Sequence, residues 1–454
     1  MNDTAPTALA QRLRAAVGDL HVSTDADVLA GRSVDWTGRY RGHAQLLVRP
    51  ADATEVSAVL TACRDHRQAV TVQGGRTSLV AGTVPEHGDV LLSTERLTEL
   101  GEVDTVERRI RVGAGVPLSR VQHAAAGAGL VVGIDLAARE SATIGGMAAT
   151  NAGGLRTVRY GAMAQQVLGL EIVLPDGSQV RRHSAVRADN TGYDLPALFI
   201  GAEGTLGVIT ALDLRLYPVP AKRITAVCGF DDLDALVSAG RALRDLETIA
   251  ALELIDGRAA GLAAQHLELP VPVPGSWLLL IELASEADPT ELLADALGGL
   301  PVCGQPAVGV DTLGRQRMWR LRESMAEVVG IFGPPLKFDV ALPLSAISAF
   351  AADSTALVAR TAHDAVPVLF GHIGEGNLHL NVLGCDTGQE SRIYTAMMEL
   401  IATHGGNVSS EHGVGSRKRG YLAMSRQPSD IAAMRTLKSA LDPTGYLNPA
   451  VLFD

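Results

Sequence analysis

Two segments in the second half of the chain, GHIGEGNLHLN and SSEHGVG, carry side chains that suit a metal ion. They supply His372, His379, Glu411 and His412. If LHLNV is a strand, His379 and Asn381 project from one face, because side chains alternate along a strand. Two imidazoles and a carboxylate suit Zn²⁺, Mn²⁺ or Fe²⁺, with positions left for substrate and water. The alternative is hydrogen-bonded core histidines, which the Glu-His pair in a glycine-flanked turn disfavours.

A cationic pair lies upstream in WRLRESMAEVVGIFGPPLKFDVALP. Helical spacing predicts Arg322 next to a face formed by Trp319, Glu323 and Ala326, with Lys337 in the following strand. Arginine suits bidentate binding of a carboxylate, and lysine acts as a point charge. The pair therefore suits an anionic substrate, although spacing alone fits ordinary surface charges equally well.

Glycine clusters in the first half have a common chemistry, because backbone N–H groups without a neighbouring Cβ can approach a phosphate closely. Together they indicate a large phosphorylated cofactor, although any single cluster could be a turn. GAEGTLG has neither the spacing nor the following helix of a dinucleotide fingerprint, and Walker A and GxSxG motifs are absent. The clusters lie at 74–75, 113–115, 145–146, 153–154 and 201–207.

Composition narrows the class of protein further. The 454 residues include 39 basic and 50 acidic side chains, a net charge of −11 that disfavours nucleic acid and anionic membranes as partners. The four cysteines are too scattered for a disulfide framework or an iron–sulfur cluster of the chain's own. With no signal peptide or transmembrane segment recognised, we expect a reduced, cytoplasmic protein.

The elements that must position these residues alternate short strands with amphipathic helices, which predicts an α+β fold with two main domains. Leu9, Leu13 and Val17 have helical spacing, and Pro218 and Pro220 mark a boundary. We expect an N-terminal extension over 1–41, an α+β domain over 42–220, a domain with an antiparallel or mixed sheet and helices over 221–420, and a helical segment over 421–454 that packs back on the first domain.

Three long motifs, TVQGGRTSLVAGTVP, GIDLAARESATIGGMAATNAGGLRTVRYG and NTGYDLPALFIGAEGTLGVIT, resemble the FAD-binding domain of the vanillyl-alcohol-oxidase or PCMH-type flavoproteins, which has two subdomains. Some relatives bond flavin covalently through a histidine where this chain has Arg76, so the resemblance implies non-covalent FAD. It assigns the pyrophosphate to Gln73, Gly74, Gly75, Arg76, Thr77, Ser78 and Leu79. It assigns the pyrophosphate and isoalloxazine to Asp135, Ser141, Thr143, Gly145, Gly146, Asn151, Ala152, Gly153 and Gly154. It assigns the adenosine half to Glu203, Gly204 and Ile209, with Asn448 a further cofactor contact.

The second half resembles the FAD-linked oxidase C-terminal domain of D-2-hydroxyacid dehydrogenases. LSTERL, LRTVRYG, EHGVGSRKR and LDPTGYLNP are most similar to the D-2-hydroxyglutarate dehydrogenase branch. A family threonine that helps to hold the distal carboxylate is Ala326 here, which leaves the substrate side chain open. The resemblance implies that His372, His379 and Glu411 bind the metal, that His412 is the acid/base, and that Arg322, Lys337 and Asn381 bind substrate.

The expected activity is oxidation of a D-2-hydroxy acid to the 2-oxo acid by hydride transfer to flavin N5, with a cap domain that holds a divalent ion, zinc before manganese or iron. A hydroxyglutarate-like substrate is favoured, and D-lactate or glycolate is the alternative. A flavin-binding protein without turnover and a metal-dependent hydrolase are the alternatives of other classes. Reduced FAD requires an external acceptor, which could be an electron-transfer flavoprotein, a quinone or an iron–sulfur partner. A homodimer is one option for the assembly.

Overall fold

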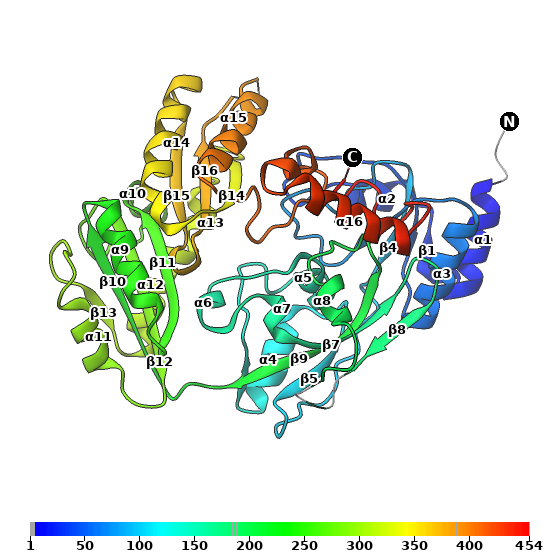
Figure 1. Ribbon diagram of the computed structural model, residues 1–454, viewed down its shortest axis with the longest axis horizontal. Helices are drawn as coiled ribbons and strands as arrows, with labels where there is room; N and C mark the ends of the chain where they lie inside the picture. Colours follow the sequence, from blue (N-terminus) through cyan, green and yellow to red (C-terminus); the bar gives the residue numbers. More distant parts are fainter. Residues whose placement is uncertain (1–4, 184–185, 187–188, 387, 454) are drawn as a thin grey trace. The chain divides into compact units, whose positions relative to one another are not determined.

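The computed structural model describes residues 5–183, 186, 189–386 and 388–453, with side chains from residue 8 onward (Figure 1). The chain forms two compact units. Unit 1 consists of Met1–Gly153, Gly161–Pro218 and Glu411–Asp454, and unit 2 of Gly154–Tyr160 and Val219–Ser410. The chain therefore enters unit 2 twice, and the short segment Gly154–Tyr160 lies within the first predicted domain in sequence.

The first part of unit 1 is a four-stranded sheet in the order β1-β2-β4-β3. Strands β2, β4 and β3 are parallel, and β1 is antiparallel to β2. Helix α3 starts after Asp52, whose carboxylate accepts the N–H groups of Thr54 and Glu55 at 2.8 Å each. The elements are α1 (Ala5–Val17), β1 (Val22–Ser23), α2 (Ala26–Arg32), β2 (Ala44–Val48), α3 (Ala53–Asp65), β3 (Val70–Gln73) and β4 (Asp89–Ser93).

The second part of unit 1 is an antiparallel five-stranded sheet in which β9 pairs with β5, β6 and β7, and β7 pairs with β8. Both sheets contribute to one apolar cluster, which also contains Leu9, Leu13 and Val17 of the predicted N-terminal helix. The elements are β5 (Arg109–Gly113), α4 (Leu118–Gly127), β6 (Leu130–Val132), α5 (Ile144–Thr150), α7 (Met163–Gln166), β7 (Val167–Val173), β8 (Gln179–Arg182), α8 (Leu195–Phe199), β9 (Val208–Pro218), η4 (Arg419–Met424) and α16 (Pro428–Leu441).

The segment after α16 returns to β3. The N–H of Val70 donates to the carbonyl of Tyr446 at 2.8 Å, and the N–H of Asn448 donates to the carbonyl of Val70 at 2.7 Å. The side chain of Asn448, 4% exposed, accepts from the N–H of Val72 at 2.7 Å and donates to the carbonyl of Glu203 at 2.8 Å. Residues 446–448 thus complete an edge that β3 alone leaves open.

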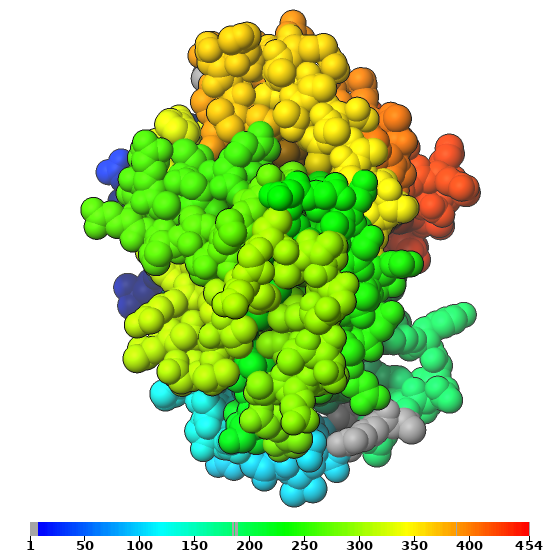
Figure 2. Space-filling model, turned by 90° about the vertical axis from the view of Figure 1, so that its left-hand side faces the viewer, coloured from blue at the N-terminus to red at the C-terminus, as the bar shows by residue number. Residues whose placement is uncertain are grey.

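Unit 2 is built on a seven-stranded antiparallel sheet in the order β13-β10-β12-β11-β15-β16-β14. Helices α10, α12 and α13 share an apolar cluster with the sheet. Figure 2 shows one face of the molecule, on which the residues of 219–410 are coloured green through yellow to orange. The strands are β10 (Lys222–Phe230), β11 (Ile249–Asp256), β12 (Trp277–Ser285), β13 (Ala307–Gly309), β14 (Leu336–Ala341), β15 (Val366–His372) and β16 (Asn377–Leu383). The helices are α6 (Thr157–Tyr160), α9 (Leu233–Arg244), α10 (Gly257–Leu267), α11 (Thr290–Leu297), α12 (Thr312–Glu323), α13 (Met325–Val328), α14 (Ile347–Thr361) and α15 (Glu390–Thr403).

The helix predicted through Arg322 is interrupted at Ser324, where α12 ends and α13 begins at Met325. The Ser324 hydroxyl donates to the carbonyl of Leu321 at 2.7 Å, a bond that competes with regular helical geometry. Glu323 and Ala326 of the predicted face are thus both exposed, and the neighbouring Arg322, 6% exposed, is buried.

Candidate flavin loop and metal-binding group

A half-buried loop over residues 74–79 follows β3 in unit 1. In the described part of the chain, no backbone N–H of residues 75–79 donates to a protein acceptor. Backbone N–H groups in such a position need water or a ligand as partner, and consecutive N–H groups favour an anion. This loop fits the pyrophosphate of the predicted cofactor.

Glycines allow this loop to lie directly against residues 141–146. A Cβ on Gly75 would lie 1.9 Å from the carbonyl oxygen of Ser141, and one on Gly74 would lie 2.6 Å from Oγ1 of Thr143. Gly145 is equally constrained, because its Cβ would lie 2.5 Å from the Cβ of Ala114. The glycines in these clusters are therefore required by close packing.

Two buried polar atoms beside the loop have no hydrogen-bond partner among the described residues, Oε1 of Gln73 and Oγ1 of Thr143. Nε2 of the same glutamine donates to the carbonyls of Arg32 and Thr83 at 2.9 Å each. Buried polar atoms left unpaired by the protein are expected to bind water or a ligand. These two atoms are consistent with a cofactor that completes the site.

Arg76 lies in the same loop with φ 56° and donates to the carbonyl of Gly31 at 3.0 Å. Burial and the neighbouring Arg32 lower the pKa of this guanidinium. A bound anion would relieve the repulsion between the two arginines. Arg76 therefore offers a half-buried cation of a kind that suits a phosphate.

Glu203, which is predicted to contact adenosine, also accepts hydrogen bonds from the backbone of a distant segment. Its carboxylate accepts the N–H groups of Val414 and Gly415 at 2.8 Å each. A Cβ on Gly413 would lie 2.9 Å from Cδ of Glu203, so the turn after the Glu-His pair is fitted to this carboxylate. Burial raises the pKa of Glu203, although the two backbone hydrogen bonds act to lower it. Its contact with adenosine stays a prediction.

The remaining predicted cofactor residues lie around α5 and β9. Asp135 is engaged by Arg139 at 2.9 Å and by Gln122 at 3.2 Å. Asn151 caps α5 with φ 51° and accepts from the N–H of Ala164 at 2.9 Å. Ser141 is exposed, Gly146, Ala152 and Gly204 are half-buried, Gly153, Gly154 and Ile209 are buried, and Gly154 is the first residue of the segment that belongs to unit 2.

In unit 2, one face of the sheet carries two of the predicted ligands, His372 and His379, and two of the predicted substrate contacts, Lys337 and Asn381. Cross-strand partners are Glu253 and His372, Asp339 and His379, and Lys337 and Asn381. Partners that lie directly opposite in an antiparallel pair project from the same face. His379 and Asn381 are two residues apart in β16, as the alternation predicts, and the register of β15 places His372 on the same face.

Glu253 is the centre of a buried network on this face. It is fully buried, and its carboxylate accepts from Nδ1 of His372 and from Nε of Arg322, both at 2.7 Å. The two Nη atoms of Arg322 donate to no described residue. The guanidinium lies 5.1 Å from the ring centre of Phe370. Its remaining donors therefore suit a ligand carboxylate.

The charge balance of this network keeps Glu253 ionised. Burial alone would raise its pKa, but His372 and Arg322 outweigh burial and hold the pKa of Glu253 below its ordinary value. An ionised carboxylate only accepts hydrogen bonds, so Nδ1 of His372 carries the proton. Nε2 is therefore the ring nitrogen of His372 that could bind a metal once it carries no proton.

The other strand residues differ in exposure. Asn381 is 3% exposed and donates to the carbonyl of His379 at 3.3 Å, whereas Lys337 is exposed. Asp339 is 2% exposed and accepts from the N–H of Ser410 at 3.0 Å. The chain leaves unit 2 at this serine. Asp339 therefore fixes the residue that directly precedes the Glu-His pair.

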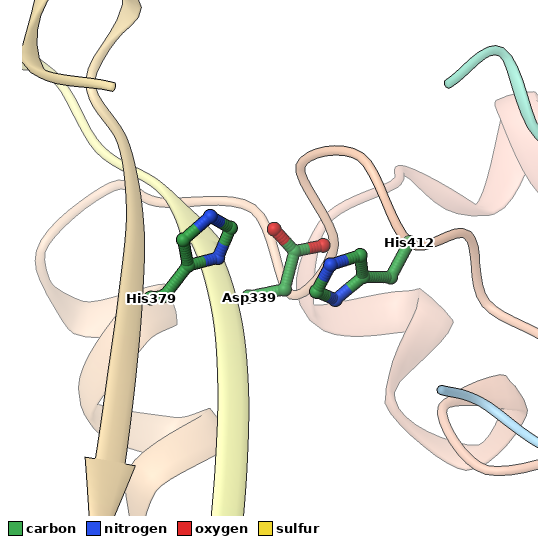
Figure 3. A group of neighbouring side chains, drawn as sticks. All are labelled: Asp339, His379 and His412. Carbon is green, nitrogen blue, oxygen red and sulfur yellow. The ribbon is translucent and has the colours of Figure 1, made fainter. Parts of the chain in front are cut away.

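Two overlapping sets of side chains offer ligand atoms that lie within 4.8 Å of one another. One is His372, His379 and Glu411, the predicted set, and the other is Asp339, His379 and His412. Figure 3 shows the carboxylate of Asp339 between the imidazole rings of His379 and His412. Two nitrogen ligands and one carboxylate fit a divalent ion of the zinc, manganese or iron type. Sequence patterns identified neither Asp339 nor Glu253.

Two family models match the chain. One is described as FAD binding domain and matches residues 44–182, and the other is described as FAD linked oxidases, C-terminal domain, and matches residues 219–452. Among the helices that the structure describes, none is both long and apolar enough to cross a membrane.

Relatives of high coverage share one name. A mitochondrial D-2-hydroxyglutarate dehydrogenase of Bos taurus is 36% identical over 94% of this chain and 80% of its own length. D-2-hydroxyglutarate dehydrogenases of Xanthomonas citri and Stutzerimonas stutzeri are 35% and 32% identical, over 97% and 98% of this chain and 96% and 99% of their own lengths.

Solved structures show the fold. p-Cresol methylhydroxylase has a TM-score of 0.82 at 17% identity, and 4-ethylphenol oxidase from Gulosibacter chungangensis has 0.77 at 16%. Each match covers 100% of this chain and 98% of the other. The predicted PCMH-type α+β fold is therefore confirmed.

The chain belongs to the FAD-linked oxidases, a family of flavoprotein oxidoreductases. Within that family it falls in the branch of FAD-dependent 2-hydroxyacid dehydrogenases, as the sequence motifs predict.

Proposed function

We propose that this protein oxidises a D-2-hydroxy acid, of the D-2-hydroxyglutarate type, to the 2-oxo acid, with non-covalent FAD and a divalent ion at His372, His379 and Glu411. The observation that supports this proposal best is the buried Arg322, which belongs to the network that holds His372 and whose two Nη atoms have no hydrogen-bond partner among the described residues. A cation held in this way beside a metal-ligand set suits a substrate that carries both a carboxylate and a metal-binding hydroxyl.

Substrate binding and proton transfer are assigned to different residues. Arg322, Lys337 and Asn381 bind substrate carboxylates and orient the C–H bond that reacts, a positioning effect worth several kcal/mol, on the order of 5. His412 accepts the proton of the substrate hydroxyl as a general base. When bound, the divalent ion supplies a Lewis acid that makes this hydroxyl more acidic, and FAD supplies the acceptor for two electrons.

Reoxidation requires a partner molecule. In the part of the chain that the structure describes, none of the four cysteines forms a disulfide, two are buried, and they lie far apart in sequence. The chain therefore offers no thiolate set for an iron–sulfur cluster. An electron-transfer flavoprotein, a quinone or an iron–sulfur partner would accept the electrons.

The experiment is an anaerobic screen of purified protein against D- and L-2-hydroxy acids, followed by loss of flavin absorbance. Each acid is tested as purified, after treatment with a chelator, and after addition of Zn²⁺ or Mn²⁺. D-2-Hydroxyglutarate should bleach the flavin and its L-isomer should not. Chelation should abolish bleaching and leave the oxidised flavin spectrum unchanged, and the ion should restore bleaching.

Each other outcome identifies an alternative. Faster bleaching by D-lactate or glycolate would assign the smaller substrate. A yellow protein that no 2-hydroxy acid bleaches would be a flavin-binding protein without turnover, and a colourless, FAD-independent protein would support a metal-dependent hydrolase. Full bleaching after chelation would remove the metal from the proposal.

A further inference from the structure

Glu253 joins two groups to which the proposed function gives different tasks. Its Oε1 accepts from the metal-ligand candidate His372, and its Oε2 accepts from the substrate-binding candidate Arg322. The three side chains come from β11, β15 and α12 and are 0%, 7% and 8% exposed. Each oxygen of this buried carboxylate therefore binds one of the two groups.

We propose that Glu253 is a positioning residue that fixes the metal-binding nitrogen of His372 and the orientation of Arg322 at the same time. The inference rests on the proposed function and deepens it. Metal affinity and substrate binding are then coupled through one side chain that touches neither ligand.

The physical basis is the acceptor-only character of an ionised carboxylate. It requires a proton on Nδ1 of His372 and so leaves Nε2 as the ligand atom, and such a partner also holds the ring plane. It also neutralises a buried guanidinium through Nε, so that the Nη edge faces away from Glu253. Without this acceptor, a charged Arg322 would lie buried and uncompensated.

Substitution by glutamine separates this role from packing. Glu253→Gln preserves shape but replaces one acceptor oxygen by an NH₂ donor. Either Nδ1–H of His372 or Nε–H of Arg322 then meets a donor instead of an acceptor. The variant should bind Zn²⁺ about 10- to 100-fold more weakly, the usual effect of losing such a partner. At saturating Zn²⁺ it should still show a raised KM for D-2-hydroxyglutarate.

Glu282→Gln is a matched control. Glu282 lies in β12 of the same sheet, is 2% exposed, and accepts from Arg156 at 2.9 Å and from Trp319 at 2.8 Å. It therefore also neutralises an arginine, but it has no hydrogen bond to His372 or Arg322. Its replacement should lower the unfolding temperature and leave Zn²⁺ affinity within about twofold of the wild type. This change is much smaller than the roughly 10- to 100-fold loss that follows when a metal ligand loses its hydrogen-bond partner.

Zn²⁺ affinity is measured on the FAD-loaded full chain by competition with a chromophoric chelator. Equal affinity in the wild type, Glu253→Gln and Glu282→Gln would overturn the inference and leave the proposed function intact. A wild type that binds no Zn²⁺ would overturn the metal part of both. A loss of equal size in both variants would show a merely structural role.

A measurement on the wild type covers the case in which Glu253→Gln does not fold. Histidine ¹⁵N chemical shifts of zinc-free protein at pH 9 report which ring nitrogen carries the proton. A neutral His372 protonated on Nδ1 supports the inference. A neutral His372 protonated on Nε2 contradicts it.

Discussion

The backbone N–H of Ser410 donates a 3.0 Å hydrogen bond to Oδ2 of Asp339, one residue before Glu411. Asp339→Ala removes this acceptor, and because Ser410 is exposed, the loss is that of one hydrogen bond, about 0.5–1.5 kcal/mol in the free energy of unfolding. Because the Glu-His pair follows directly, kcat/KM should also fall by at least about tenfold, the equivalent of about 1.4 kcal/mol in transition-state binding. Urea denaturation and steady-state kinetics measure the two effects.

Ser409→Ala is the control for that substitution. The Ser409 hydroxyl lies 3.5 Å from the same carboxylate oxygen, a weak contact. Its loss should change stability by less than about 0.5 kcal/mol. Equal effects of the two variants would show that Asp339 does not fix the segment through Ser410.

Loss of the proposed general base should affect turnover and not cofactor content. His412→Ala should bind FAD as the wild type does and lose about 10²- to 10⁴-fold in kcat, the contribution of general base catalysis. His404→Ala is the control, because His404 pairs with Asp353 at 3.0 Å and belongs to neither ligand set. Near-normal kcat in His412→Ala would remove this residue from the proton transfer.

The conformation of the loop over residues 74–79, called the flavin loop here, depends on Gly75. In Gly75→Ala the new Cβ would lie 1.9 Å from the carbonyl of Ser141, so the loop must move and its N–H groups with it. The ratio of flavin to protein absorbance should fall to near zero. Gly127→Ala in α4 meets nothing within 4 Å and should keep full FAD content. Full FAD content in Gly75→Ala would mean that the cofactor does not use this loop.

A substitution at Ala326 tests how the distal carboxylate of the substrate is recognised. If a threonine at this exposed position in α13 helps to hold a distal carboxylate, Ala326→Thr should raise kcat/KM for D-2-hydroxyglutarate relative to D-lactate by severalfold, in line with about 0.5–1.5 kcal/mol for one hydrogen bond. Unchanged selectivity would assign no specificity role to this position.

The network around Glu253 predicts a pH dependence of stability. The pKa of Glu253 lies below its ordinary value of 4.5 when folded, so the unfolded chain binds more protons there as the medium is acidified. Its contribution is complete above about pH 4.5 and is lost as the pH falls through the folded pKa. The stability advantage of the wild type over Glu253→Gln should therefore shrink below pH 4.5, measured by urea midpoints. A constant difference would contradict the pKa direction.

Sequence periodicity predicted most elements, because apolar spacing and turn residues are local signals. Leu9, Leu13 and Val17 have the predicted helical spacing, and β16 carries His379 and Asn381 on one face. The helix break at Ser324 escaped prediction, because a serine hydroxyl bonded to its own helix leaves the apolar spacing unchanged.

The missed residues depend on long-range register. Glu253 is one acidic residue in the apolar run IAALELID, and its partner His372 lies 119 residues further along the chain. Only the pairing of β11 with β15 brings them together. The sequence did contain a weak signal for Asp339. It follows the recognised Lys337 by two residues in one strand and so lies on the same face. Glu203 was assigned by resemblance, which indicates a cofactor contact but not a partner 211 residues away.

Residues 446–448 complete the edge of β3, and the side chain of Asn448 bonds to both Val72 and Glu203. During translation, a nascent chain that ends before residue 446 contains every glycine of the flavin loop but lacks these bonds. Domains that are contiguous in sequence can fold while synthesis continues, but unit 1 cannot, since it draws on three separate stretches. Loading with flavin is therefore expected to wait until residues 446–448 have been synthesised, so that assembly of the holoenzyme depends on a segment more than 360 residues after the flavin loop.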